Sequence, residues 1–212
     1  MDKVIIVIAS TNGAVFDRAM YVEECRKNIS MLISDRHCGA VESAIHHGVP
    51  AVVLDSSSGE QFSEALHEYF NGKAVDFFIS SYTRVFAGRF LEKYQGRIVN
   101  FHPALLPACP GLDGFGDTVR SGCQFIGSTA HFVDEGIDTG KPILQAVAPY
   151  DPHASLEHNR HKVYVQLCKM FVQTVDWMAQ GRIGPGGVIG GSYLSSEFIP
   201  NLESAAALQL RE

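Results

Sequence analysis

The run RIVNFHPALLPACPG at residues 97–111 combines the end of a strand with the loop that follows it. Its first five residues, 97–101, include Ile, Val and Phe, which predicts a buried strand. The remainder is rich in proline, and Pro103 disfavours a helical conformation at the preceding residue, His102. The stretch therefore predicts a buried strand that stops at a loop and carries Asn100 and His102 to that end.

Upstream of this run, the same strand pattern recurs between amphipathic segments of helix length. The upstream strand-like runs occupy residues 4–9, 29–34, 51–54 and 75–80. They are nearly continuous in apolar residues instead of alternating, which is typical of a parallel sheet covered by helices on both faces. The sequence therefore predicts an α/β fold with a doubly wound, mostly parallel, Rossmann-like sheet in a single domain.

Downstream of the run, two further strands are predicted at residues 128–133 and 143–149, followed by a long helix at 155–180. The apolar residues of that helix recur at spacings of three and four: Val163, Leu167, Met170, Phe171, Val175 and Met178. We expect this stripe to dock on the sheet. Residues 1–183 are expected to form the domain, and residues 184–212 a C-terminal extension whose role the sequence leaves open.

The composition narrows the class of partner. The net charge is −6 and the 17 Lys and Arg residues are spread along the chain, which argues against nucleic-acid binding and favours small-molecule substrates. The N-terminal apolar run is too short to span a membrane and lacks a signal-peptide cleavage site. Five cysteines without a CxxC pair predict a reduced, cytoplasmic chain without a metal site. The oligomeric state is left open.

Three polar side chains are candidates for chemistry. In doubly wound sheets, ligands bind beyond the carboxyl ends of the strands, where Asn100 and His102 are expected. Strand alternation places both on one side of the chain and turns Phe101 away. In STAHFVDEGIDTGKPI, residues 128–143, the interior carboxylate candidate is Asp138. An Asp beside a His favours the cationic imidazolium, which suits a developing oxyanion, so the set favours direct acyl transfer between bound substrates.

Two longer strings then point to a family. NFHPALLPACPG, followed by GSTAHFVDEGIDTGKPILQ, resembles the folate-dependent formyltransferases, most closely those that act on glycinamide ribonucleotide. The resemblance covers roughly residues 3–183 and is tightest over 84–145. It implies an enzyme of purine biosynthesis that uses 10-formyltetrahydrofolate as co-substrate, without a metal, and transfers the formyl group to a primary amine.

The resemblance also implies roles for the three candidates. Asn100 would donate a hydrogen bond to the oxyanion of the tetrahedral intermediate, and cationic His102 would share that role. Asp138 would hold His102 and help an ordered water carry the amine proton to the folate nitrogen. His131 corresponds to a family histidine near the site, with its role left open.

Two sets of binding residues follow from the same resemblance. The folate slot would be formed by Arg84, Val85, Phe86, Leu91, Asp134 and Glu135. Apolar walls with a few polar groups at the edge suit a pteridine ring. The acceptor phosphate would be held by Ser10, Thr11, Asn12 and Gly13, in the loop between the first strand and the first helix.

The chain departs from the family at the acceptor positions. In STNGAVFD, Ala14 and Val15 replace the Ser and Asn of the family's Gly-Ser-Asn signature, and Leu167 stands where the family has a Glu that contacts the ribose. These changes leave the three reactive positions intact but weaken the phosphate site. Two alternatives therefore stay open: transfer to another amine, such as an amino sugar nucleotide or other metabolite, and hydrolysis of 10-formyltetrahydrofolate.

Overall fold

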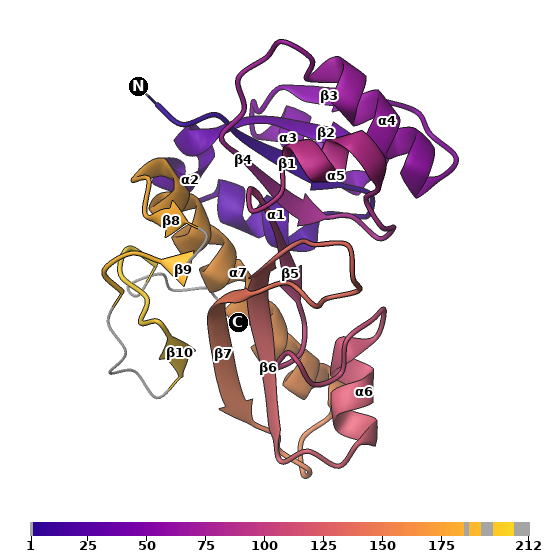
Figure 1. Cartoon of the computed structure of the whole chain (residues 1–212). Coiled ribbons are helices and arrows are strands. Elements are labelled where there is room, and N and C mark those ends of the chain that lie inside the picture. Colours follow the sequence, from indigo (N-terminus) through magenta and orange to yellow (C-terminus); the bar gives the residue numbers. More distant parts are fainter. Residues whose placement is uncertain (1, 185–186, 192–196, 206–212) are drawn as a thin grey trace.

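The computed structural model describes residues 2–184, 187–191 and 197–205, and an eight-stranded sheet runs through its whole length (Figure 1). The strand order is β10-β7-β6-β5-β4-β1-β2-β3. These strands are β1 Ile5–Ala9, β2 Ile29–Ser34, β3 Ala51–Val53, β4 Phe77–Ser81, β5 Ile98–His102, β6 Phe125–Phe132, β7 Pro142–Pro149 and β10 Phe198–Ile199. A separate two-stranded sheet pairs β8 Ile183–Gly184 with β9 Gly187–Val188. The helices are α1 Ala14–Met20, α2 Glu23–Asn28, α3 Gly39–His46, α4 Gly59–Tyr69, α5 Gly88–Lys93, α6 Gly114–Arg120 and α7 Leu156–Ala179.

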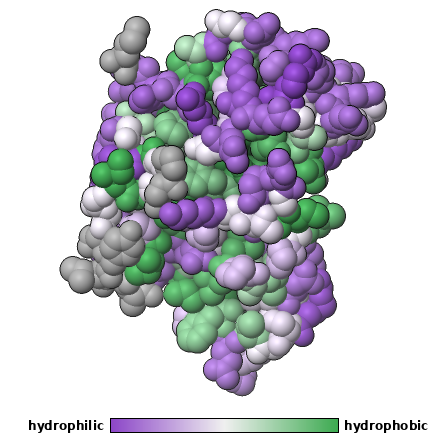
Figure 2. All heavy atoms as spheres, viewed as in Figure 1, coloured by the Kyte–Doolittle hydropathy of each residue, from purple (hydrophilic) through white to green (hydrophobic). Residues whose placement is uncertain are grey.

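The first half of the sheet is parallel. Its central strand, β1, has the sequence IIVIA, is buried along its whole length and pairs in parallel with β2 and β4. Parallel pairing continues to β3 on one side and to β5 on the other. One core packs α1, α3 and α7 against the sheet, and a second core contains α4 and α5. Figure 2 shows that the outer face of α4 and α5 is largely hydrophilic, as covering helices require.

The predicted doubly wound, mostly parallel sheet is confirmed, and the first five strands lie within two residues of their predicted bounds. Beyond β5 the pairing turns antiparallel, from β5 to β6 and from β6 to β7. The predicted start of β6 at residue 128 was wrong by three residues, because Phe125, Ile126 and Gly127 continue the pairing with β7. The long helix lies where it was predicted, and the hydroxyl of Ser155 caps it by accepting from the backbone N–H of His158.

The described part of the predicted C-terminal extension packs against the domain. β10 pairs antiparallel with β7, and Ala205 is completely buried. The side-chain oxygen of Gln173 on α7 accepts a hydrogen bond from the backbone N–H of Ala205 (3.3 Å). The boundary at residue 183 stays a prediction, and residues 185–186, 192–196 and 206–212 of the predicted extension lie outside the described part.

This topology brings together chain segments that are far apart in sequence. The parallel strands β1, β4 and β5 are neighbours and end at the same edge of the sheet. The loop after β1 and the loop after β4 are joined there, because Ser10 Oγ accepts from the backbone N–H of Thr83 (3.1 Å). The residues that follow these strands therefore surround one space, as expected for a doubly wound sheet.

Candidate active site

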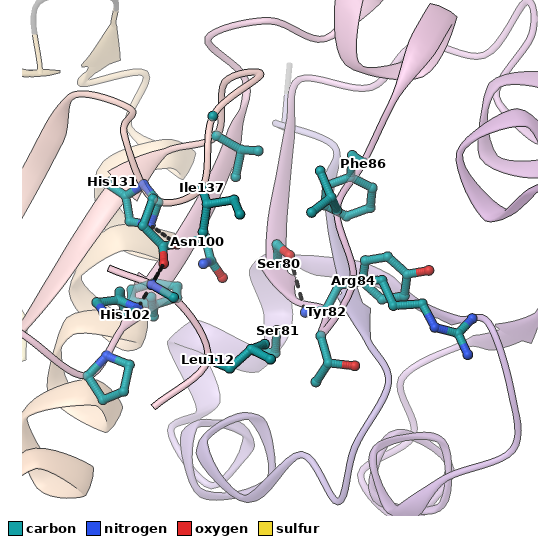
Figure 3. A pocket seen from close by; sticks show the side chains of 18 of the residues that line it. Ser80, Ser81, Tyr82, Arg84, Phe86, Asn100, His102, Leu112, His131 and Ile137 are labelled. Carbon is teal, nitrogen blue, oxygen red and sulfur yellow. Dashed lines mark hydrogen bonds and ion pairs between the residues drawn. The ribbon is translucent and has the colours of Figure 1, made fainter. Parts of the chain in front are cut away.

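Asn100 and His102 end β5 and line a cavity of about 550 Å³. Figure 3 shows Asn100, His102 and His131 gathered on one wall of this cavity. The ring of Phe101 stacks on Phe171 of α7, with ring centroids 5.6 Å apart, as the alternation along β5 predicts, although Phe101 also contributes to the lining of the cavity. No hydrogen bond within the described residues involves the Asn100 side chain. Its amide is therefore available to a ligand.

Asp138 reaches the same cavity from the loop between β6 and β7. Its backbone adopts a left-handed conformation, φ 53°, which Asp tolerates better than most residues. Its Oδ2 accepts from the backbone N–H of Gly111 (2.8 Å) and lies 3.3 Å from Nδ1 of His102. Its Oδ1 lies 3.5 Å from Nε2 of His131. The structure thus brings the three candidate side chains to one place, and the carboxylate faces the imidazole.

The ring of His102 is held at both nitrogens. Nε2 lies 2.7 Å from the carbonyl oxygen of Cys109, and Nδ1 faces Asp138. The carbonyl can only accept, so Nε2 donates to it, and Nδ1 lies within ion-pair distance of the carboxylate. The ring of His102 thus lies between two acceptors, beside Asn100. Direct donation from His102 to a substrate oxygen, which we expected from the sequence, would require one of these contacts to be replaced.

His131 on β6 is buried and presents one nitrogen to Asp138. Its Nδ1 lies 2.8 Å from the carbonyl oxygen of Phe132, to which it donates. Its Nε2 has no hydrogen-bond partner among the described residues. Burial lowers the pKa of His131 below its usual value, although the hydrogen bond to Phe132 and the charge of Asp138 oppose that effect. We therefore expect a neutral ring whose Nε2 lone pair faces the site.

The depressed pKa of His131 predicts a pH dependence of stability. The unfolded chain binds a proton at this histidine more readily than the folded chain does, so its contribution is present above the unfolded pKa, about 6.5, and is lost as the pH falls below it. We expect the free energy of unfolding, measured by urea denaturation, to fall between pH 7 and pH 5.5. In His131→Asn this fall should be smaller. Equal pH slopes in the two proteins would contradict the prediction.

Gly114, the first residue of α6, allows His102 to sit where it does. A Cβ on Gly114 would lie 2.3 Å from Nε2 of His102 and 3.2 Å from Cβ of Ala104. Gly114→Ala should push the ring off the Cys109 carbonyl and lower kcat by about 10- to 100-fold, at a stability cost of about 1–3 kcal/mol. The control is Gly184→Ala, where an added Cβ meets nothing within 4 Å. Steady-state rates and thermal melting of both variants test this, and equal kcat values would contradict it.

The residues predicted to bind folate lie around two adjoining cavities. Arg84, Val85, Phe86 and Asp134 line the large cavity, and Figure 3 shows Phe86 and Arg84 across it from His102. The second cavity, of about 360 Å³, is lined by Val85, Phe86, Leu91, Asp134 and Glu135, together with four further residues. All six predicted residues are therefore brought together. Their role in binding stays a prediction.

The predicted acceptor loop is only partly directed at the cavity. Of its four residues, Thr11 alone lines the cavity. Ser10 is buried and bonded to Thr83, and Asn12 is exposed. Gly13 adopts a positive φ of 68° and packs so closely on Ala40 that a Cβ there would lie 2.6 Å from the Ala40 Cβ. The structure therefore directs one of the four predicted side chains to the site.

The apolar replacements noted in the sequence do line the site. Val15, from the start of α1, and Leu167, from α7, both face the cavity. Leu112 and Ile137 are on its wall too, although their side chains are largely exposed, at 94% and 63%. Val15 and Leu167 thus place apolar side chains on the side of the cavity nearest α1 and α7.

The sequence did not indicate the backbone groups that contact His102 and Asp138. The carbonyl of Cys109 and the N–H of Gly111 both belong to the proline-rich loop after β5. Cys109 has a positive φ of 53°, and the run of Pro and Gly around it was the signal of an unusual loop conformation. No group of three or more His, Cys, Asp or Glu side chains suited to a metal ion occurs in the part of the chain that the structure describes.

The fold and the site together define an α/β protein in which an amide, an imidazole and a carboxylate line one cavity. The family model described as formyl transferase matches residues 3–175. This chain belongs to the formyl transferase family.

Named relatives agree with this assignment. The phosphoribosylglycinamide formyltransferase of Bacillus subtilis strain 168 is 32% identical over 170 residues, which cover 76% of this chain and 87% of the relative. That of Haemophilus influenzae is 30% identical over 86% of this chain and 90% of the relative. The crystal structure of glycinamide ribonucleotide transformylase 1 from Symbiobacterium toebii has a TM-score of 0.77 at 31% identity, covering 86% of this chain and 89% of that one. The resemblance seen in the sequence is confirmed.

Proposed function

We propose that this enzyme transfers the formyl group of 10-formyltetrahydrofolate to the primary amine of glycinamide ribonucleotide. The observation that carries the proposal is the convergence of Asn100, His102 and Asp138 on one cavity. The family and the names of the relatives support the same reaction. The reaction serves purine biosynthesis, and a trifunctional purine biosynthetic protein from Drosophila melanogaster is 36% identical over 129 residues of this chain.

The cavity offers what the attack of an amine on a formyl carbon requires. The amine nitrogen forms a bond to that carbon, and the formyl oxygen gains negative charge. The amide of Asn100 donates a hydrogen bond to this oxygen, since its own donors are uncommitted. In the proposed mechanism His102 supplies a cationic ring next to it, between the carbonyl of Cys109 and the carboxylate of Asp138. Because these charges are fixed before the reaction, they stabilise the transition state more than the ground state.

The attack also requires a proton to move. The amine loses a proton, and the folate nitrogen gains one when its bond to the formyl carbon breaks. Asp138 is 13% exposed, which places its carboxylate at the border between the buried ring and the open cavity. We assign it the role of guiding a water molecule that carries the proton. Oδ1 of Asp138 lies 3.5 Å from Nε2 of His131, so the carboxylate lies between the two imidazole rings.

The walls around the second cavity fit a pteridine ring. Phe86 and Leu91 are buried in the core that contains α4 and α5, so this wall is rigid and apolar. Asp134 and Glu135 lie opposite, on the loop that carries Asp138. Carboxylates and backbone groups at the rim suit the amino and ring nitrogens of a pterin. Folate would then lie between the segment after β4 and the loop after β6, with its formyl group toward Asn100.

The test is an assay of the purified chain with 10-formyltetrahydrofolate and glycinamide ribonucleotide. We expect tetrahydrofolate and formylated acceptor to appear in equal amounts, measured by absorbance and mass spectrometry. Release of formate without an acceptor would instead identify a hydrolase. If neither tetrahydrofolate nor formate forms, the proposed function is wrong.

A second acceptor class is favoured by Val15 and Leu167, which make the acceptor side of the cavity apolar. Transfer to an amine with an apolar neighbouring group, or to an amino sugar nucleotide, would fit that wall. A panel of amines, ranked by kcat/KM, separates the two. If the apolar wall limits the reaction with glycinamide ribonucleotide, Leu167→Glu should raise kcat/KM for that acceptor. If another amine is the acceptor, the same change should leave kcat/KM for glycinamide ribonucleotide unchanged.

The cellular location and the binding partners of the enzyme are part of the same proposal. Within the described residues, no helix combines the length and the apolar character needed to cross a membrane. We propose a cytoplasmic enzyme whose partners are the folate and the amine, without a role in nucleic-acid binding. The net charge of −6 supports that last point.

A further inference from the structure

The start of α1 borders the acceptor side of the cavity. Val15, in the first turn of α1, lines the cavity. The helix has only seven residues, and Gly13 at its N-cap supplies no side-chain hydrogen bond to the first turn. Because so short a helix is unstable by itself, its position depends on contacts with neighbouring elements. These contacts therefore decide where the side chain of Val15 lies.

One side of α1 packs tightly on α3. A Cβ added to Gly13 would lie 2.6 Å from the Cβ of Ala40, so the two backbones are in close contact. Further along α1, Oδ1 of Asp17 accepts from Oγ of Ser43 (2.7 Å) and lies 3.1 Å from Nε2 of His47. No residue of α3 lines the cavity. The contact with α3 therefore holds α1 on the side away from the substrate.

On its other side α1 lies against α7, which carries the second apolar residue of the acceptor side (Figure 1). Oη of Tyr164 on α7 donates to the carbonyl oxygen of Ala14 (3.2 Å). Within the part of the chain that the structure describes, this is the one hydrogen bond between the two helices. Leu167, which lines the cavity with Val15, follows Tyr164 by about one helical turn. The bond thus joins the residue before Val15 to the turn before Leu167.

The surroundings of the Tyr164 phenol suit a hydrogen-bond donor. The side chain is half-buried, and burial, followed by the neighbouring thiol of Cys168, raises the pKa of Tyr164 to about 12. The phenol therefore keeps its proton at neutral pH. The apolar part of the contact is the edge-on packing of Phe16 on Phe171, with ring centroids 6.4 Å apart. Apolar packing has little directional preference, whereas a hydrogen bond fixes a distance between two atoms.

We propose that Tyr164 positions the acceptor side of the cavity. By holding the first turn of α1 to α7, it sets the separation of Val15 and Leu167, and hence the fit of the amine substrate between them. Tyr164 itself does not line the cavity, so it acts through α1. The folate side is built from the segments after β4 and β6, so the effect is restricted to the amine. This inference rests on the proposed transfer of a formyl group to an amine.

Tyr164→Phe removes the hydroxyl and keeps the ring. With glycinamide ribonucleotide, or with whichever amine the panel ranks first, we expect KM for the amine to rise about three- to tenfold, as the loss of one neutral hydrogen bond implies. The kcat and the KM for 10-formyltetrahydrofolate should stay unchanged. The matched control is Tyr94→Phe, because Oη of Tyr94 has no hydrogen-bond partner among the described residues and the ring belongs to the core on the other face. It should alter none of the three constants.

Hydrogen exchange measures the hold on α1 without turnover. The backbone N–H of Asp17 donates to the carbonyl of Gly13 (2.8 Å), and we expect this amide and those that follow in α1 to exchange faster in Tyr164→Phe than in Tyr94→Phe. Equal exchange would show that the phenol does not hold α1, and would overturn the inference. Faster exchange with an unchanged KM for the amine would overturn it as well.

The remaining outcomes separate this inference from the proposed function. An equal rise in KM for amine and folate would indicate a general structural defect and would overturn the role assigned to Tyr164. If the unmodified chain formylates no amine, the proposed function fails, and calorimetry with glycinamide ribonucleotide then decides the inference. Weaker binding in Tyr164→Phe alone would support it, and equal or absent binding in all three proteins would overturn it.

Discussion

Asp138→Asn is expected to lower kcat/KM for formyl transfer about a thousandfold, within the range of about 10²- to 10⁴-fold that positioned acid–base groups supply. The amide keeps the shape of the side chain but removes the charge that faces His102 at 3.3 Å. It also offers no anionic oxygen to guide the water that carries the proton. The measurement is steady-state formation of tetrahydrofolate under saturating amine.

Thermal melting of the Asp138→Asn variant shows whether the protein still folds. Asp117→Asn is the matched control, because Asp117 is an exposed carboxylate on α6 that pairs with Arg120. We expect the control to keep the activity of the unmodified enzyme. A loss of less than threefold in Asp138→Asn, in a folded protein, would remove this carboxylate from the mechanism.

Asn100→Ala is expected to lower kcat by about 10²- to 10³-fold, the usual effect of deleting one oxyanion donor. The KM for the folate should change little, because the hydrogen bond strengthens only as the formyl oxygen becomes charged. Asn100→Asp should be worse than Asn100→Ala, since it adds a negative charge next to the developing oxyanion. Single-turnover rates measure the chemical step directly.

The control for Asn100 is Asn28→Ala on α2, where the side chain donates only to the carbonyl of Glu24. That change should leave kcat unaltered. If Asn100→Ala raised KM for either substrate while kcat stayed constant, Asn100 would bind substrate uniformly and would not stabilise the transition state.

Much of the fold could be predicted because its signals are local. The IIVIA run of β1 is apolar without alternation, and only a strand buried on both faces suits it. Antiparallel pairing was harder to place. The start of β6 at Phe125 depends on its partner Pro149 in β7, 24 residues later, so no local pattern marks it. The contact of Ala205 with α7 is equally non-local.

The sequence predicted the residues around Asn100 and His102 better than it predicted those on the acceptor side of the cavity. Asn100 and His102 are two residues apart on one strand, so the period of a strand alone places them together. Their approach to Asp138 was proposed from the residue types, and no local pattern fixes it, because the contact of Gly111 with Asp138 spans 27 residues. On the acceptor side, the sequence suggested four ligands and the structure directs only Thr11 to the cavity. Packing of Gly13 on Ala40 and bonding of Ser10 to Thr83 decide this.

By itself, the sequence determined the parallel sheet, the side of β5 that carries Asn100 and His102, and the family. These follow from hydrophobic periodicity and from motif residues adjacent in the chain. Only the tertiary structure decided that His102 is held between Cys109 and Asp138. The reason is physical: such contacts form when the ends of non-consecutive strands meet at one edge of the sheet, and strand order is set by packing of the whole chain.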